Sequence, residues 1–206
     1  MLRRSPRARS LLLLACLAWL APVHARAAVT VYTTLASFQA AAPTASLGTD
    51  FESLTTGYKA TFTSGGITFS STLNNLYVIG PTLPGTTSPL PPTHMLSANG
   101  EEDITMTLVA GSTSTFGFTL LTNAYGGHTL YLFDTSGVVF FTYHPTQAAN
   151  TIGFLGFVSD TPIGKARWVA GQGQVQNTAL DNIYYDVANA TPAAGSTWGR
   201  IKSLYR

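Results

Sequence analysis

Few residues of this 206-residue chain have the types and spacing that catalysis or metal binding would need. Beyond residue 27 the chain has three histidines, His94, His128 and His144, and none is spaced from another like a pair of metal ligands. No H-E-x-x-H or G-x-S-x-G motif is present. We expect His128, which follows a glycine-containing turn, to lie at the surface rather than to act as a base.

The densest acidic cluster is Glu101, Glu102 and Asp103. A glycosidase needs two carboxylates about 5–10 Å apart, one on each side of the sugar. Adjacent residues in a turn do not supply that geometry, and the E-x-D-x-x-E strand motif of jelly-roll glycoside hydrolases is absent. We therefore interpret the cluster as a solvated turn before a strand that begins at Ile104. The chain is expected not to be an enzyme, and a jelly-roll glycoside hydrolase is kept as an alternative.

Aromatic side chains favour a binding function over catalysis. Sugar rings stack on exposed aromatic residues, and polar neighbours orient their hydroxyl groups. Tyr125 lies in a loop with glycines close by, so we choose Tyr125 and Asn123 as the candidate ligand-binding residues. Trp168 has Ala166 and Ala170 two residues away on either side, which indicates a buried position in the core.

The first 27 residues have the pattern of a secretory signal peptide. Four arginines precede an apolar stretch at 10–22, and Ala25-Arg26-Ala27 supplies a small-x-small cleavage pattern. The apolar stretch is shorter than the roughly 20 residues that span a membrane. We predict cleavage after Ala27 and a secreted or cell-surface location. The single cysteine, Cys16, is lost with this segment, so no disulfide is expected.

Cleavage at this point changes the charge of the protein. The full chain has 11 basic and 9 acidic residues, a net charge of +2. Five of the basic residues lie before residue 28, so the remainder has six basic and nine acidic residues and a net charge of −3. Charged residues make up only 10% of the chain. This composition argues against a nucleic-acid partner, which needs clustered Lys and Arg.

Hydrophobic periodicity predicts an all-β fold, a jelly roll or β-sandwich of roughly ten strands in a domain at 28–187. Apolar and polar residues alternate strictly at 104–108, which indicates one buried face and one threonine-coated face. A turn at 134–137 joins two strands into a predicted hairpin. One short N-terminal helix is expected, with Thr34 as its N-cap and Leu35, Phe38 and Ala42 on one face.

Three segments fall outside the strand pattern. The residues at 80–97 include five prolines and form either a functional loop or a cover for a sheet edge. A linker at 188–197 leads to a basic, aromatic C-terminal tail at 198–206. Through Trp198, Arg200, Lys202 and Arg206 this tail is expected to contact a membrane surface or a sorting machinery, unless it is a frayed terminus.

Several motifs occur in a recognisable order. They are Tyr32–Phe38, Asp50-Phe51-Glu52 with Gly57, Ser64–Phe69, Phe154–Ile163 and Leu180–Tyr184. This order resembles exported bacterial β-sandwich proteins of the PEP-CTERM, or exosortase-sorted, type. Their C-terminal Pro-Glu-Pro, hydrophobic span and basic tip have no counterpart in this sequence. The resemblance implies a lectin-like jelly roll without catalysis, and hence a polysaccharide or another envelope component as partner.

A calcium site is also expected by analogy with carbohydrate-binding jelly rolls of similar layout, in which acidic residues on an early and a late strand hold a structural Ca²⁺. The corresponding candidates are Glu52 and Asp181, with Asp50 and Asn182 as weaker ones. Calcium binds six to eight oxygens, so carboxylates and backbone carbonyls from the two chain ends would suit it. The alternative is that both carboxylates accept hydrogen bonds from turn amides. The leading hypothesis is a secreted, non-catalytic protein that binds glycan or matrix, and the alternative is a structural envelope protein sorted by its tail.

Overall fold

A computed structural model of the chain describes residues 27–72, 76–85, 87, 89–98, 103–122, 127–170 and 178–186. Within them lie one helix and fourteen strands. The strands are β1 (Val29–Tyr32), β2 (Ser46–Thr49), β3 (Gly57–Lys59), β4 (Phe62–Ser64), β5 (Ile67–Ser70), β6 (Leu76–Ile79), β7 (Met95–Ala98), β8 (Asp103–Leu108), β9 (Thr113–Thr122), β10 (His128–Phe133), β11 (Val139–Tyr143), β12 (Thr151–Ile163), β13 (Lys165–Ala170) and β14 (Ala179–Tyr185). No helix among the described residues is long and apolar enough to cross a membrane.

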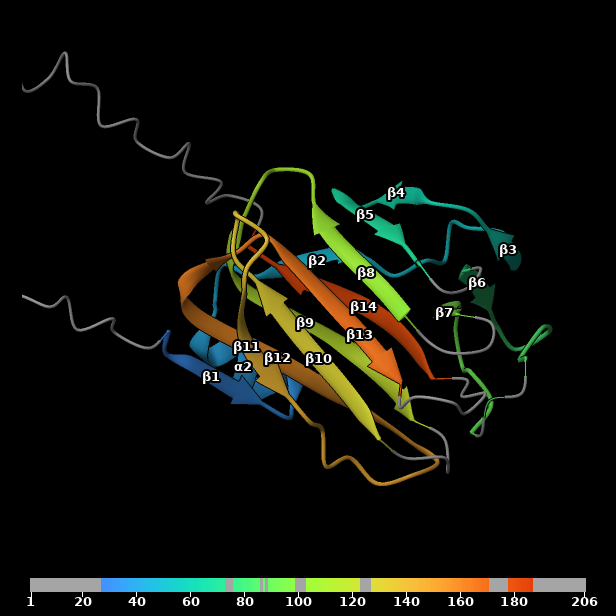
Figure 1. Cartoon of the computed structure of the whole chain (residues 1–206). Coiled ribbons are helices and arrows are strands. Elements are labelled where there is room, and N and C mark those ends of the chain that lie inside the picture. Colours follow the sequence, from blue (N-terminus) through green and yellow to red (C-terminus); the bar gives the residue numbers. More distant parts are fainter. Residues whose placement is uncertain are drawn as a thin grey trace, which may run out of the picture.

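The strands form two antiparallel sheets that face each other (Figure 1). The first sheet, called sheet A, has the order β1-β12-β9-β14-β7-β6-β3, and β2 also pairs with β14. The second, sheet B, has the order β11-β10-β13-β8-β5-β4. The predicted β-sandwich is thus confirmed. The strand count exceeds the expected ten in part because β2 was not expected and because β7 lies partly within the segment 80–97, which was expected to be a loop.

The space between the sheets is filled by one large hydrophobic core. Every second residue of β8, β10 and β13 points into it, and these residues are buried: Ile104, Met106, Leu108, Leu130, Leu132, Ala166 and Trp168. Trp168 is fully buried, as its alanine neighbours predicted, and its Nε1 donates to Thr178 Oγ1 at 2.9 Å. The intervening residues of the same strands must therefore face outward.

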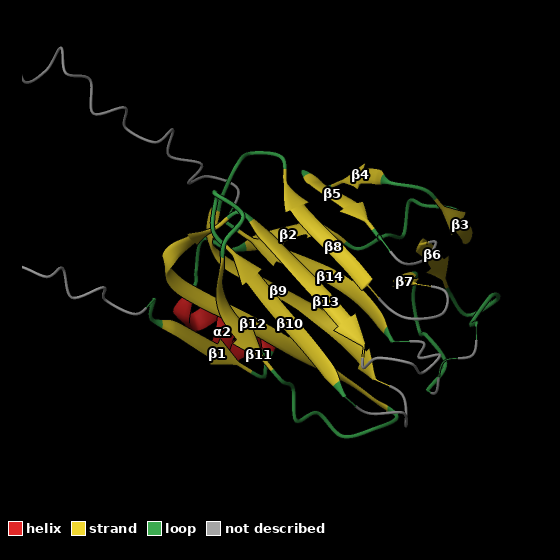
Figure 2. Ribbon diagram, viewed as in Figure 1, coloured by secondary structure: helices red, strands yellow, loops and turns green. Residues whose placement is uncertain are grey.

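Helix α2 (Leu35–Ala41) covers part of the outer face of sheet A, and Figure 2 shows it behind β12. Thr34 is its N-cap, as predicted, and the Thr34 hydroxyl accepts from Ser37 N at 3.2 Å. Phe38 is fully buried against Phe154, with 5.5 Å between the ring centroids. The helix thereby shields apolar residues of sheet A that would otherwise face water.

The proline-containing segment lies at the other end of the same outer face. Ile79, Met95, Leu121 and Ala179 form a separate buried cluster there, on the opposite side of the sheet from the main core. A Cβ on Gly85 would lie 3.6 Å from Ile79 Cγ2, so the segment packs directly on this cluster. The geometry supports the interpretation of the segment as a structural cover.

Two expectations about polar residues were wrong. Asp103 is fully buried rather than part of a solvated turn, because Arg167 on the neighbouring strand β13 neutralises its carboxylate. His128 is buried rather than exposed, because its ring packs against Trp168 with 5.2 Å between the centroids. Both errors concern residues whose burial is decided by a neighbouring strand.

Candidate binding site

The two predicted metal ligands lie close together on the outer face of sheet A. Phe51, with φ of +60°, is fully buried in the core and holds the turn that carries Glu52. Asp181 lies on β14 beside a break in register, followed by Asn182 with φ of +47°. The charge of Glu52 acts on Asp181, so the fold brings these distant parts of the sequence into one region.

The carboxylate oxygens in this region accept hydrogen bonds from the protein. Glu52 Oε1 accepts from the backbone N of His94 at 2.8 Å. Asp181 Oδ1 accepts from the backbone N of Asn182 at 2.7 Å, and Asp181 Oδ2 accepts from Thr93 Oγ1 at 2.8 Å and from Asn182 Nδ2 at 2.9 Å. Both carboxylates thus accept hydrogen bonds from backbone amides, and calcium binding stays a prediction.

Asp181 has an unusual electrostatic environment for a carboxyl group. Its side chain is only 2% exposed, and burial raises the pKa of Asp181 to about 7. The negative charges of Glu52 and Asp50 add to this rise, whereas hydrogen bonds from Thr93 and Asn182 oppose it. A cation would relieve the repulsion among the three carboxyl groups. Carboxylate oxygens are of the type that calcium prefers. Glu52 Oε1 and both oxygens of Asp181 accept hydrogen bonds from the protein. Among the described residues, no group of three or more His, Cys, Asp or Glu side chains is placed to hold a metal.

The remaining residues predicted from the sequence cannot be placed. Tyr125 and Asn123, the candidate ligand-binding pair, lie outside the described residues. The same holds for the linker and for the tail with Trp198, Arg200 and Lys202. These assignments stay predictions.

The outer face of sheet B forms a second polar surface. Alternation in the sequence predicted the threonine-coated side of β8, but not its alignment with Arg167 and Tyr131 on neighbouring strands. The register of this sheet places Thr142, Tyr131, Arg167, Thr105 and Ser70 side by side across five strands. A second row contains Val139, Phe133, Lys165, Thr107, Thr68 and Thr63. At about 4.8 Å between strands, six strands span about 24 Å. We call these two rows the hydroxyl face.

An ion pair fixes the centre of the hydroxyl face. Arg167 Nε donates to Asp103 Oδ1 at 2.6 Å, and Arg167 Nη2 donates to Asp103 Oδ2 at 3.0 Å. Burial alone would raise the pKa of Asp103, but hydrogen bonds from Arg167 and Thr72 and the charge of Arg167 lower it below its ordinary value. The Arg167 side chain is 36% exposed and uses two of its five N–H groups on Asp103. It therefore presents a fixed guanidinium edge to solvent.

The aromatic residues of the hydroxyl face are Tyr131 and Phe133, both half-buried on β10. Lys165 Nζ lies 4.0 Å from the centroid of the Phe133 ring, so this ring carries a cation on its face. Tyr131 is the direct cross-strand neighbour of both Arg167 and Thr142. An aromatic ring, a guanidinium group and hydroxyl groups thus lie within one strip of the surface.

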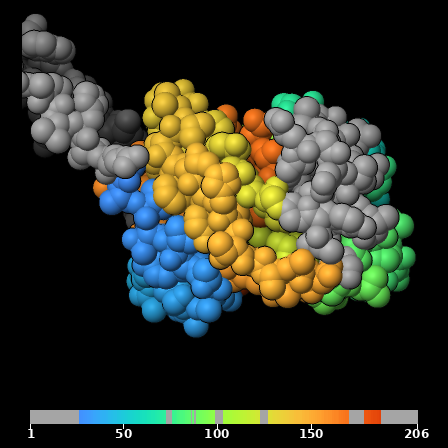
Figure 3. Space-filling model, turned by 60° about the horizontal axis from the view of Figure 1, so that its bottom comes forward, coloured from blue at the N-terminus to red at the C-terminus, as the bar shows by residue number. Residues whose placement is uncertain are grey.

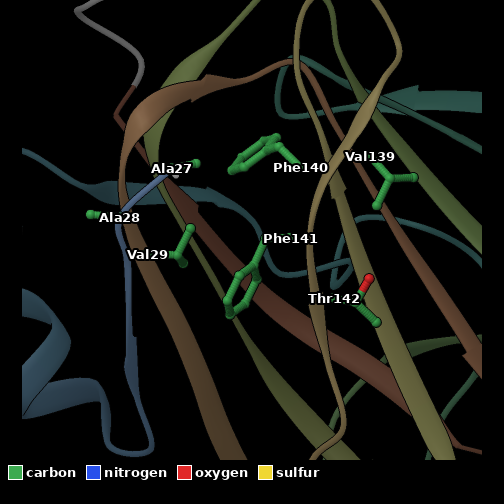
Figure 4. A pocket seen from close by; sticks show the side chains of 7 residues that line it. All are labelled: Ala27, Ala28, Val29, Val139, Phe140, Phe141 and Thr142. Carbon is green, nitrogen blue, oxygen red and sulfur yellow. The ribbon is translucent and has the colours of Figure 1, made fainter. Parts of the chain in front are cut away.

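A cavity of about 650 Å³ lies at one edge of the sandwich, between the edge strands β1 and β11. In Figure 3 the blue N-terminal residues lie beside the gold residues that include β11. It is lined, as Figure 4 labels, by Ala27, Ala28, Val29, Val139, Phe140, Phe141 and Thr142. The side chains of these residues are apolar except that of Thr142. Thr142 also belongs to the hydroxyl face, so the two features adjoin at β11.

No protein-family model matches the chain, and no curated protein matches it. Solved structures with a similar arrangement include the cleaved adhesin domain of Lys-gingipain, at 15% identity and a TM-score of 0.46, covering 76% of this chain and 99% of that domain. A variant of a family 29 carbohydrate-binding module is 10% identical with a TM-score of 0.37, covering 68% and 90%. Another variant of that module, complexed with cellulohexaose, is 13% identical with a TM-score of 0.34, covering 79% and 92%.

Proposed function

We propose that the chain is an exported, non-catalytic β-sandwich that binds polysaccharide through the hydroxyl face. The observation that carries this proposal is the strip formed by Thr142, Tyr131, Arg167 and Thr105 on four neighbouring strands. Its groups have the chemistry that sugars need: a ring for stacking, a guanidinium that donates to hydroxyl or carboxylate oxygens, and hydroxyls that donate and accept.

The shape and rigidity of this surface also support the proposal. A sheet face about 24 Å long suits an extended chain that lies across the strands. The bond between Arg167 and buried Asp103 holds the guanidinium in place, so little conformational entropy is lost when a ligand binds. The proposal of a non-catalytic role is supported by Asp103, because this member of the acidic cluster is fully buried and paired with Arg167.

The experiment is a glycan array followed by titration calorimetry with the chain 28–206. Neutral and uronic-acid-containing polysaccharides are compared, because Arg167 and Lys165 favour a ligand with carboxylate groups. Binding to at least one polysaccharide is expected, and the substitution Tyr131→Ala should weaken it about tenfold or more, as the loss of a stacking ring does at binding hot spots.

Tyr58 provides the matched control. It is 56% exposed on β3 of sheet A, so the substitution Tyr58→Ala removes an equally large aromatic ring from the other sheet. This variant should bind as the unaltered chain does. Absence of binding to every polysaccharide, or equal losses for the Tyr131 and Tyr58 variants, would refute the hydroxyl face as the binding site.

A further inference from the structure

At the N-terminal edge of the sandwich, Ala28 forms two hydrogen bonds with Asp160. The backbone N of Ala28 donates to Asp160 Oδ1 at 2.9 Å, and the backbone N of Asp160 donates to Ala28 O at 3.2 Å. The next residue, Val29, is the cross-strand partner of Ser159. The position of the Ala28 nitrogen is therefore set from both sides, by the start of the β1–β12 ladder and by the Asp160 side chain.

We propose that proteolytic removal of residues 1–27 creates an ion pair between the new α-amino group of Ala28 and Asp160. This inference rests on the export that is part of the proposed function. Hydrolysis of the Ala27–Ala28 peptide bond consumes one water, leaves a carboxylate on Ala27 and frees the Ala28 nitrogen as an α-ammonium group. The amide donor at 2.9 Å from Asp160 Oδ1 then becomes a charged donor at the same place.

The fold already holds the two groups in position for this change. Asp160 Oδ1 also accepts from Thr161 Oγ1 at 3.3 Å, which orients the carboxylate toward Ala28. The carboxylate is already an ionised acceptor, so the gain on cleavage is the added Coulomb attraction between the α-ammonium group and Asp160. Ala28 and Asp160 are exposed, so solvent and salt screen part of this gain.

The ion pair with Asp160 requires that the processed chain begin at Ala28. A chain that began at Val29 would lack the nitrogen that contacts Asp160, and a chain that began earlier would keep an uncharged amide there. Ala27 lines the cavity between β1 and β11 (Figure 4), so processing after this residue also removes one of the residues that line it. The processed protein is therefore expected to begin at Ala28.

The test compares two purified proteins, a chain 28–206 and the same chain preceded by Gly-Ser, each with and without the substitution Asp160→Asn. In the chain that begins at Ala28, this substitution should lower the Tm by about 1–3 °C more than in the extended chain. The additional loss should shrink in 1 M NaCl, where the screening length falls to about 3 Å.

Asp134→Asn is the matched control. Asp134 Oδ1 accepts from the backbone N of Ser136 and of Val138, both at 2.9 Å, so its replacement should lower the Tm equally in both chains. Equal losses for Asp160→Asn in both chains would overturn the ion pair. N-terminal sequencing of the exported protein that gave a first residue other than Ala28 would overturn the processing position. Neither measurement depends on glycan binding, so this inference and the binding proposal fail separately.

Discussion

The ion pair between Asp103 and Arg167 is expected to stabilise the fold, and removing Arg167 measures by how much. Replacing Arg167 by methionine keeps an apolar stem against the sheet but removes both donors to a carboxylate that is fully buried. Breaking a buried pair in this way costs about 3–5 kcal/mol. Because the Arg167 side chain is 36% exposed, water replaces part of the interaction, and we expect a loss of about 2 kcal/mol. For a domain of this size the Tm should fall by about 4–8 °C.

The pH dependence of this loss distinguishes an electrostatic cause from simple packing. In the unaltered chain the pKa of Asp103 lies below its ordinary value of 3.8, so its stabilising contribution is complete above pH 3.8 and is lost as the pH falls through the lowered value. In the methionine variant the buried carboxylate lacks its cation, so its pKa rises and protonation relieves the cost. The stability difference between the two chains should therefore narrow from pH 7 to pH 4.

Urea unfolding monitored by circular dichroism measures this difference at both pH values. Lys165→Ala is the control, because it removes another cation from the same strand but only a contact with Phe133, worth about 0.5–1 kcal/mol and independent of pH in this range. A loss below about 0.5 kcal/mol at pH 7 for the Arg167 variant, or a loss of equal size at pH 4, would show that the pair does not stabilise the fold as argued.

Three further predictions concern other parts of the molecule. Burial lowers the pKa of His128 below its ordinary 6.5, so the free energy of unfolding is at its full value above pH 6.5 and decreases as the pH falls below it. His128→Phe should reduce this pH dependence. If urea unfolding shows the same pH dependence for the variant, the lowered pKa of His128 is contradicted. A Cβ on Gly65, at φ of +53°, would lie 1.9 Å from Gly48 O, so Gly65→Ala should lower the free energy of unfolding by about 2–3 kcal/mol. A Cβ on Gly137 would have no atom within 4 Å, so Gly137→Ala should destabilise the fold less. Equal destabilisation of the two variants in thermal unfolding would contradict this prediction. Calcium should raise the Tm by a few degrees because it relieves the repulsion at Asp181, and EDTA should reverse this rise. A Tm that neither calcium nor EDTA changes would reject the site. A calcium-dependent rise in Tm that persists in Glu52→Gln would also reject it.

The sequence was most informative where local pattern and local chemistry agree. Alternation at 104–108 predicted which side of β8 is buried, and the turn at 134–137 predicted the β10–β11 hairpin. Thr34 was identified as an N-cap because its hydroxyl can reach an amide three residues later. Each of these features is decided within a few residues, so no knowledge of the sheet order is needed.

The candidate sites depend on contacts between strands that are distant in sequence. Asp103 and Arg167 are 64 residues apart and meet only because β13 pairs with β8, and Tyr131 joins them only because β10 pairs with β13. A solvated acidic turn was the reasonable expectation for Asp103 without its partner strand. Glu52 and Asp181 were paired by analogy and hydrogen bonds to amides were considered, but the donors themselves, the backbone N of His94 and of Asn182, were visible only in the structure.

The two outer faces of the sandwich differ in a way that bears on function. Sheet A carries apolar side chains outside the main core, among them Phe154, Ile79 and Leu121, and α2 and the proline-containing segment cover this face. Sheet B carries threonines and a fixed ion pair on its outer face, and polar groups of this kind are stable in contact with water. A sheet face that does not need a cover remains accessible to a partner, and its rigidity comes from the core beneath it. For this reason we assign polysaccharide binding to sheet B. Substitutions of the exposed hydroxyls of β8, such as Thr107→Ala, should weaken polysaccharide binding while changing the free energy of unfolding by less than about 0.5 kcal/mol.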